Sequence, residues 1–320
     1  MARHRWKKLG LTFPLLELDR PTWMNSHAQS PATLELSDRI RIYFSTRQPA
    51  DSDGRFVSNV GFADFSKKDP TQLLGVSQEP VIPLGGRGRF DEFGIYPWSV
   101  IRADDKIRAY FGGWTRPTST PFNVGIGVAE SSDGGLSFKR LGQGPVLSYS
   151  PDEPFVLSSP RIRKFGAVYY LFYIAGSAWV KNGERLDPIY RIRGARSDDG
   201  LCWTKFNIDL IQPVLPGEAQ ASPDVFWHDG EFHMFFCFRH GVDFHRDGRG
   251  YRIGYATSKD LMTWNRNDSD AGLSRALSGF DSEMVSYPHH FFIGPKRYLA
   301  YLGNDFGRAG FGLAELESAI

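Results

Sequence analysis

The sequence has little cysteine and almost no net charge. Its two cysteines, Cys202 and Cys237, cannot form a disulfide framework and lie in no Cys-x-x-Cys or zinc-finger spacing, so we expect two reduced, mostly buried thiols. The 38 Lys and Arg residues exceed the 36 Asp and Glu residues by only two. This balance lacks the basic excess of proteins that bind nucleic acids or anionic membranes.

Long apolar runs are also missing. No window approaches the roughly 18 apolar residues that a membrane-spanning helix needs. The basic stretch from Met1 to Lys8 resembles the start of a signal peptide, but Gly10 and Pro14 interrupt the segment that follows, and no cleavage site comes after it. We therefore expect a soluble, cytoplasmic protein.

The sequence is instead rich in aromatic and turn-forming residues. Aromatic residues make up 14% of the 320 residues, too many for a disordered chain, and 34 Gly with 20 Pro indicate many turns between short elements. No segment has the sustained 3.6-residue apolar period of a long helix, so helices should be few and short.

One pattern recurs five times along the chain: Ser or Tyr, then Pro, an apolar strand, a polar turn and an aromatic-rich strand. The prolines of this pattern lie 66, 63, 63 and 65 residues apart, at Pro31, Pro97, Pro160, Pro223 and Pro288. Each unit continues with a strand that carries small residues, Gly61–Ala63, Gly127–Ala129, Gly194–Ala195, Gly254–Ala256 and Gly312–Ala314. The repeat thus predicts four short strands in each unit.

Four-stranded units repeated around an axis are the blades of a β-propeller. We therefore predict an all-β fold, a five-bladed propeller that forms a single domain over residues 1–320. The last unit ends at Ile320 after its third strand. Residues 6–17 are expected to supply its fourth strand and close the ring, which would remove an exposed sheet edge.

Three of the small-residue strands are followed by a turn of one type. These turns resemble Asp-boxes and span Ser131–Phe138, Ser197–Trp203 and Ser258–Trp264. Asp or Gly at the apex supplies turn geometry, and the closing aromatic residue packs back on the hairpin. We interpret these turns as structural.

Candidate functional groups gather around the blade prolines, because the first strand of each blade lines the central channel of a propeller. The acidic candidates are Asp91, Glu92, Glu218, Asp224, Asp281 and Glu283. Polar groups buried along a channel need partners, so a water-filled, ligand-binding funnel is expected. Each set of acids also has a structural alternative. Asp91 and Glu92 would cap a loop or pair with Arg87 or Arg89, and Asp224 would hydrogen-bond to the backbone of the inner strand. Glu218 and Glu283 would form structural salt bridges, for instance with Arg161 or Arg239.

Aromatic and basic residues add to this set. Trp98, Trp114 and Trp179 fall near blade tops, where a ring can stack on a sugar or pack between blades. Four arginines and two histidines between Arg239 and Arg252 suit a carboxylate or phosphate better than a metal. No His, Asp or Glu spacing is diagnostic of a metal site, so no catalytic metal and no cofactor are expected.

Some of these motifs resemble a known superfamily. The segments Phe90–Pro97 and Tyr251–Ser258, together with the repeated Pro-apolar strands, are similar to five-bladed propeller glycoside hydrolases. That superfamily includes arabinanases and xylosidases of family 43, invertases and levanases of family 32, and mannoside phosphorylases of family 130. The resemblance implies a funnel with an Asp base or nucleophile, a supporting Asp and a Glu acid. Family members typically carry Asp directly before a blade proline, whereas this chain has Ser30, Tyr96, Ser159, Ser222 and Tyr287.

The leading hypothesis is an enzyme that acts on a glycosidic bond, a hydrolase, transferase or phosphorylase. Glycoside hydrolysis needs a carboxylic acid and a carboxylate. We assign Glu218 as the acid, its pKa raised by Glu283 or Asp281, and Asp91 as the base. The substrate-binding candidates are His27, Gln29, Glu92, Tyr96, Trp98, Trp114, Ser159, Arg161, Asp224, Arg239 and His289.

The expected partners are a small carbohydrate, a nucleotide sugar or a phosphosugar, with no nucleic acid and no membrane span. Two other functions stay open. The missing Asp-Pro acids favour a non-catalytic glycan-binding propeller, and an exposed apolar patch on the top face would instead favour a protein-interaction platform.

Overall fold

The computed structural model describes residues 3–319, whose regular secondary structure consists mainly of antiparallel β-strands. The predicted all-β class is confirmed. The first group of paired strands is β3 (Ser26–Glu35), β4 (Arg39–Arg47), β5 (Ser58–Ser66) and β6 (Leu73–Val76). The next is β7 (Gly94–Ala103), β8 (Lys106–Thr115), β9 (Asn123–Ser131) and β10 (Lys139–Arg140). One parallel pair, Ser58 with Gly94, joins these two groups into an eight-stranded sheet.

The same order of four strands returns twice more. One sheet is β11 (Phe155–Phe165), β12 (Val168–Asn182), β13 (Arg185–Ser197) and β14 (Thr204–Lys205). The other is β15 (Ala219–His228), β16 (Glu231–Arg239), β17 (Arg252–Ser258) and β18 (Trp264–Arg266). The predicted four-stranded units are thus confirmed.

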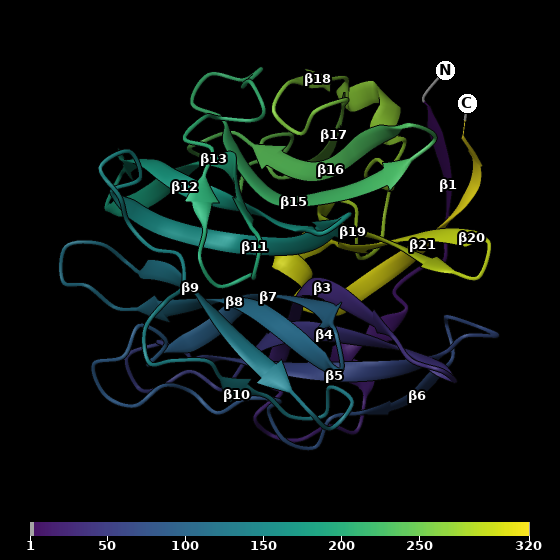
Figure 1. Ribbon diagram of the computed structural model, residues 1–320, viewed down its shortest axis with the longest axis horizontal. Helices are drawn as coiled ribbons and strands as arrows, with labels where there is room; N and C mark the ends of the chain where they lie inside the picture. Colours follow the sequence, from purple (N-terminus) through teal and green to yellow (C-terminus); the bar gives the residue numbers. More distant parts are fainter. Residues whose placement is uncertain (1–2, 320) are drawn as a thin grey trace.

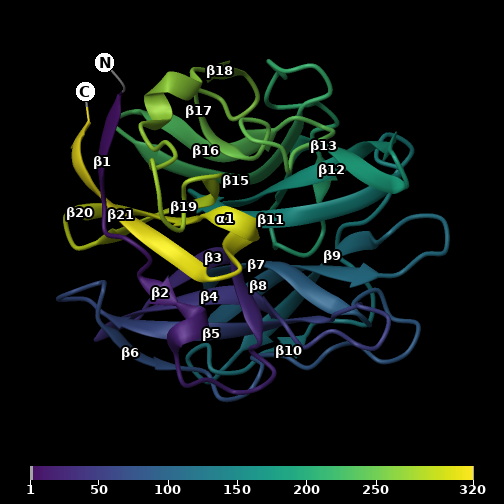
Figure 2. The same cartoon turned by 180° about the vertical axis from the view of Figure 1, so that it is seen from behind.

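The last sheet combines both ends of the chain. It contains β19 (Ser286–Ile293), β20 (Lys296–Leu302) and β21 (Gly310–Ala319), and β1 (His4–Lys8) pairs with β21. The short β2 (Phe13–Pro14) also pairs with β21. The N-terminal pairing therefore begins before residue 6 and is split into two strands, instead of running continuously over residues 6–17. Figures 1 and 2 show β1 beside β21, with the start of β1 next to the end of β21.

Helical segments are short, as predicted. They are η1 (Leu15–Glu17), η2 (Asp268–Ala271) and α1 (Asn304–Gly307).

The first strand of each group lies toward the middle of the molecule, while β6, β10 and β18 lie at its outside (Figures 1 and 2). Contacts between first strands follow the chain order, β3 with β7, β7 with β11, β11 with β15 and β15 with β19. Strand β19 in turn contacts β3. The residues around the blade prolines, which all lie on these inner strands, are thereby brought toward one another.

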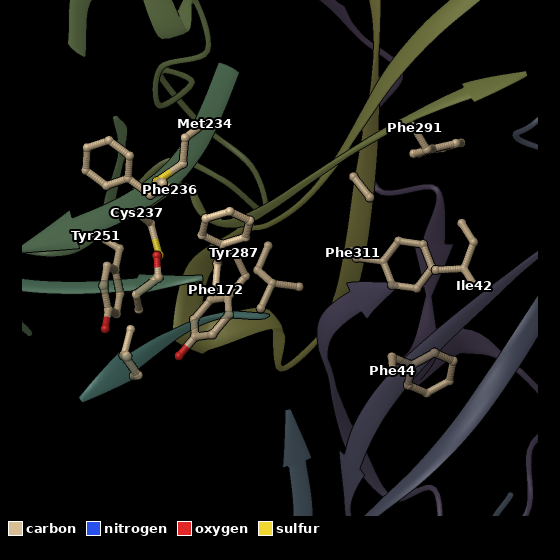
Figure 3. Close-up of a cluster of buried hydrophobic side chains, with 14 of the residues drawn as sticks. Ile42, Phe44, Phe172, Met234, Phe236, Cys237, Tyr251, Tyr287, Phe291 and Phe311 are labelled. Atoms are coloured by element: carbon tan, nitrogen blue, oxygen red, sulfur yellow. The ribbon is translucent and has the colours of Figure 1, made fainter. Parts of the chain in front are cut away.

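A large apolar cluster packs around the inner strands. Figure 3 shows part of it, with Met234, Phe236 and Cys237 on one side and Ile42 and Phe311 on the other. Cys237 is fully buried, as expected, but Cys202 is exposed. The burial prediction is wrong for Cys202 because this residue lies in a hairpin turn, where its backbone N–H donates to Asp199.

The Asp-box-like turns are built as the sequence predicted. In the first turn, Asp133 accepts hydrogen bonds from the Ser131 hydroxyl and from the backbone N–H groups of Leu136 and Ser137. These bonds hold the pKa of Asp133 at about 2, although burial acts in the opposite direction. The carboxylate of Asp133 thus accepts hydrogen bonds from its own turn, which agrees with a structural role.

Candidate functional site

The pairing of the first and second strands is irregular at every blade proline. Register shifts lie between Gln29 and Ala32, Ile95 and Trp98, Ser158 and Arg161, Ala221 and Asp224, and Ser286 and His289. The residue before the proline has a left-handed φ of 50° to 54° at Ser30, Ser159, Ser222 and Tyr287. At the remaining position the Tyr96–Pro97 bond is cis. Left-handed φ is unfavourable for residues other than glycine, and such strain concentrates at functional sites.

Two adjoining cavities open on the residues that precede these prolines. One has a volume of about 400 Å³ and takes lining residues from every inner strand, Gln29, Tyr96, Ser158, Ser159, Ala221 and Tyr287. The second has a volume of about 1030 Å³ and shares Gln29, Arg47, Tyr96, Tyr190, Tyr251 and Tyr287 with the first. We call the two cavities together the funnel. The volume of the smaller cavity lies within the range of small-molecule sites, and that of the larger lies at its upper end.

Tyrosines form one part of the funnel wall. The ring centroids of Tyr96 and Tyr287 are 6.2 Å apart, and those of Tyr251 and Tyr287 are 5.8 Å apart. Burial raises the pKa of all three phenols. The hydroxyls therefore stay protonated at neutral pH, where they can donate and accept hydrogen bonds.

Arginines form another part of the funnel wall. The Arg47 guanidinium lies 4.1 Å from the centroid of the Phe56 ring, and burial lowers its pKa. Arg116 donates to the backbone carbonyl of Phe56 at 2.6 Å. Arg239 is buried, faces the Phe244 ring at 3.8 Å and donates to backbone carbonyls. Within residues 3–319, none of the three arginines has a carboxylate oxygen within 4.0 Å.

The funnel also holds two carboxylates. Asp187 is buried, accepts a hydrogen bond from Asn182 at 3.0 Å and lies 3.6 Å from Arg185. Glu184 is exposed at the rim. Neither residue was among the predicted acids.

The predicted base and acid lie outside the funnel lining. Asp91 is fully buried, and Arg140 donates to it at 2.6 Å. Glu218 is also fully buried, and it accepts hydrogen bonds from Arg266 and Gln220, both at 2.8 Å. Both carboxylates thus have a structural partner in place, the alternative that the sequence had left open.

The remaining predicted acids, Asp281, Glu92 and Glu283, also lie outside the funnel lining. Asp281 is paired with Lys8 at 2.6 Å and accepts a hydrogen bond from the Tyr301 hydroxyl at 3.1 Å. Glu92 accepts a hydrogen bond from the backbone N–H of Gly88 at 2.8 Å. Glu283 is exposed and lines a separate cleft of about 660 Å³ together with Arg252. The structure therefore does not bring these acids together on the funnel wall.

Residues shortly after the prolines form a largely buried group that we call the ionic cluster, Arg161, Arg163, Asp224 and His289. Asp224 is paired with Arg163, lies 3.5 Å from Arg161 and 3.3 Å from His289 Nδ1, and accepts the backbone N–H of His290. Burial would raise the pKa of Asp224, but the positive groups outweigh it and hold that pKa well below its usual value. Burial and Arg161 lower the pKa of His289 to about 4. A small cavity of about 220 Å³ adjoins the cluster.

The other predicted binding residues divide between the funnel and the core. Gln29, Tyr96, Trp114, Ser159 and Arg239 line the funnel. Trp98 is fully buried against Tyr43, Phe111 and Phe138, so its ring has no free face for a sugar. His27 is buried and hydrogen-bonded to the hydroxyl of its neighbour Ser26.

Arg47 and Arg116 were not predicted as site residues, although the repeat carried a signal for Arg47. Arg47 and Arg239 are the last residues of β4 and β16, and both come four residues after the partner of the post-proline residue. They are therefore equivalent positions of the repeat. Since Arg239 was already a predicted binding residue, its equivalent position on β4 indicates Arg47 as well.

Two negative findings concern metals and membranes. No group of three or more His, Cys, Asp or Glu residues suited to a metal ion lies within residues 3–319. Over the same range, no helix is long and apolar enough to cross a membrane.

No protein-family model matches the chain. Two proteins of Mycobacterium tuberculosis, the uncharacterized proteins MT1551 and Rv1502, are each 35% identical to it over 317 residues, covering 98% of this chain and 99% of each relative.

Solved structures with a similar fold include a glycoside hydrolase with a TM-score of 0.74 at 14% identity, covering 98% of this chain and 92% of the other. A thermostable family-43 glycoside hydrolase has a TM-score of 0.66 at 16% identity and covers 92% of both chains. The β-1,2-mannobiose phosphorylase of Listeria innocua has a TM-score of 0.64 at 13% identity, covering 90% of this chain and 89% of the other. The fold is thus that of the propeller superfamily that the sequence motifs resemble.

Proposed function

We propose that this chain, which belongs to the same family as the two Mycobacterium tuberculosis proteins, is a carbohydrate-active propeller. In this proposal the funnel binds a saccharide. The single observation that carries the proposal is the funnel itself. An aromatic cavity of about 1030 Å³ adjoins the strained residues before the blade prolines, and hydroxyl and guanidinium groups converge on it. Structural neighbours named as a glycoside hydrolase and a mannobiose phosphorylase support a saccharide ligand.

The proposal includes the architecture of the ring. We propose five blades in a single domain over residues 1–320, with β1 as the outer strand that closes the last blade. The cyclic contacts from β3 through β19 and back to β3 support this arrangement, as does the pairing of β1 with β21.

Trp114 offers the sharpest test of saccharide binding. Its ring lines the funnel and lies near Phe93 and Phe56, as a stacking platform would. We expect an array of oligosaccharides to identify ligands, and Trp114→Ala to weaken their binding at least tenfold. The control is Trp227→Ala, since Trp227 is 50% exposed and does not line the funnel. Equal binding by the wild type and Trp114→Ala would contradict the proposal.

Action on a glycosidic bond is a second candidate, and the carboxylates Asp187 and Glu184 favour it. Both line the larger cavity, and glycoside cleavage needs one acid and one carboxylate. Loss of turnover in Asp187→Asn with ligand binding retained would establish this function. The earlier assignment of Glu218 and Asp91 is a competing prediction, which undiminished turnover in Glu218→Ala and Asp91→Ala would disprove.

The finer properties of the ligand also remain proposals. Nucleotide sugars and phosphosugars are proposed partners because arginines line the funnel. A cytoplasmic location stays a prediction from the sequence.

A further inference from the structure

The funnel has more positive than negative charge. Five arginines line it, Arg47, Arg55, Arg116, Arg185 and Arg239, against the two carboxylates Glu184 and Asp187. Two of the arginines have counterions of their own. Arg55 pairs with Asp51 at 3.1 Å and Arg185 lies 3.6 Å from Asp187. The charges of Arg47, Arg116 and Arg239 are left without a carboxylate within the part of the chain that the structure describes.

Burial makes this surplus unfavourable in the free protein. Arg239 is 3% exposed, and its Nε is buried without a hydrogen-bond acceptor. The Nε of Arg47 is likewise buried and unpaired. Backbone carbonyls and aromatic rings stabilise these cations only in part, because neither carries a negative charge. Among residues 3–319, no carboxylate of the protein balances the charges of Arg47, Arg116 and Arg239.

The three arginines approach the funnel from different strands. Arg47 ends β4, Arg116 follows directly after β8, and Arg239 ends β16. Strands β4 and β8 lie in one half of the molecule and β16 in the other (Figure 1). An anionic group between the halves is thus accessible to guanidinium groups from both sides.

We infer that the funnel selects saccharides that carry an anionic group, a carboxylate or a phosphate, and that Arg47, Arg116 and Arg239 bind that group. This inference rests on the proposed saccharide function and names its substrate class. The planar guanidinium matches both kinds of anion with paired N–H donors. The protonated hydroxyls of Tyr96, Tyr251 and Tyr287 are left to bind sugar hydroxyls. A neutral saccharide would leave the positive charges uncompensated.

Binding of matched saccharides tests the inference. An array of neutral, uronic-acid-containing and phosphorylated oligosaccharides is probed with the wild type, Arg47→Gln and Arg47→Lys. The control variant is Arg196→Gln, which removes the same charge from an exposed position on β13 outside the funnel. Thermal unfolding with inorganic phosphate tests the anion site without a sugar.

We expect acidic saccharides to bind at least tenfold more tightly than neutral ones. Arg47→Gln should remove most of that advantage, and Arg47→Lys should restore part of it, whereas the control Arg196→Gln should leave it unchanged. Preference for uronic acids or for phosphorylated sugars identifies the anion. The advantage should also shrink as salt is added.

Two contrary results are distinguishable. If neutral and acidic saccharides bind equally and Arg47→Gln changes neither, the inference is overturned while the saccharide function stands. If no saccharide binds but inorganic phosphate raises the melting temperature of the wild type and not of Arg47→Gln, the funnel binds an anion but both saccharide proposals are overturned.

Discussion

In the ionic cluster, Arg161 and Arg163 share the buried carboxylate of Asp224, whereas in the funnel Arg47 and Arg239 meet only aromatic rings and backbone carbonyls. Both groups lie near blade prolines, but at different positions of the repeat. Arg161 and Asp224 directly follow prolines, while Arg47 and Arg239 end the neighbouring second strands. The positions directly after the prolines thus supply charges that pair with each other inside the protein. The ends of the second strands supply arginines that have no carboxylate partner within residues 3–319 and that line the funnel. The first set serves stability, and the second is available for binding.

The largest expected effect comes from breaking the ionic cluster. Asp224→Ala leaves two arginines without their carboxylate, so we expect a loss of about 3–5 kcal/mol in the free energy of unfolding. Urea denaturation measures the loss, with exposed Asp198→Ala as the control. A loss below about 1 kcal/mol would contradict the view that Asp224 stabilises the protein by compensating the charges of Arg161 and Arg163.

The second-largest effect is expected from lowering the pH, which should reduce the free energy of unfolding through His289 of the ionic cluster. The pKa of His289 is about 4 in the folded protein against 6.5 ordinarily, so between these values the unfolded chain binds more protons. Stability should therefore fall as the pH drops from about 6.5 to 4, by on the order of 2 kcal/mol from this residue. Comparing the pH dependence of urea unfolding in the wild type and His289→Gln isolates that share. Parallel pH profiles would contradict the prediction.

These buried pairs also show what the sequence does and does not predict. The strands were predictable because Pro, Gly and aromatic residues recur locally in each unit. The partners of Asp91 and Glu218 could not be predicted, since Arg140 on β10 and Arg266 on β18 lie 49 and 48 residues away along the chain. Only the three-dimensional pairing brings each arginine to its carboxylate. A carboxylate in a repeat therefore suggests a site but does not distinguish a catalytic acid from a structural ion pair.

Removing a funnel arginine should have the opposite sign from breaking the cluster. Arg47→Met replaces a partly buried, unpaired charge with an apolar side chain, so the free energy of unfolding should stay constant or rise by up to about 1 kcal/mol. Arg161→Met in the cluster should instead lose about 2 kcal/mol or more, because Asp224 then keeps fewer positive partners. Urea titrations of the two variants side by side decide the comparison. Destabilisation of equal size would show that Arg47 has a structural role.

Arg55 gives the smallest effect and the finest distinction, because it lines the funnel yet has its own carboxylates. It lies 3.1 Å from Asp51 and 2.5 Å from Asp53, and all three side chains are at least 41% exposed. Exposed pairs of this kind contribute little, so Arg55→Gln should change stability by less than about 0.5 kcal/mol. It should also change affinity for an acidic saccharide by at most about twofold, against at least tenfold for Arg47→Gln. If calorimetric titration finds equal losses for the two variants, overall positive charge governs binding. If only Arg47→Gln loses affinity, the absence of an internal counterion identifies the arginines that bind the ligand.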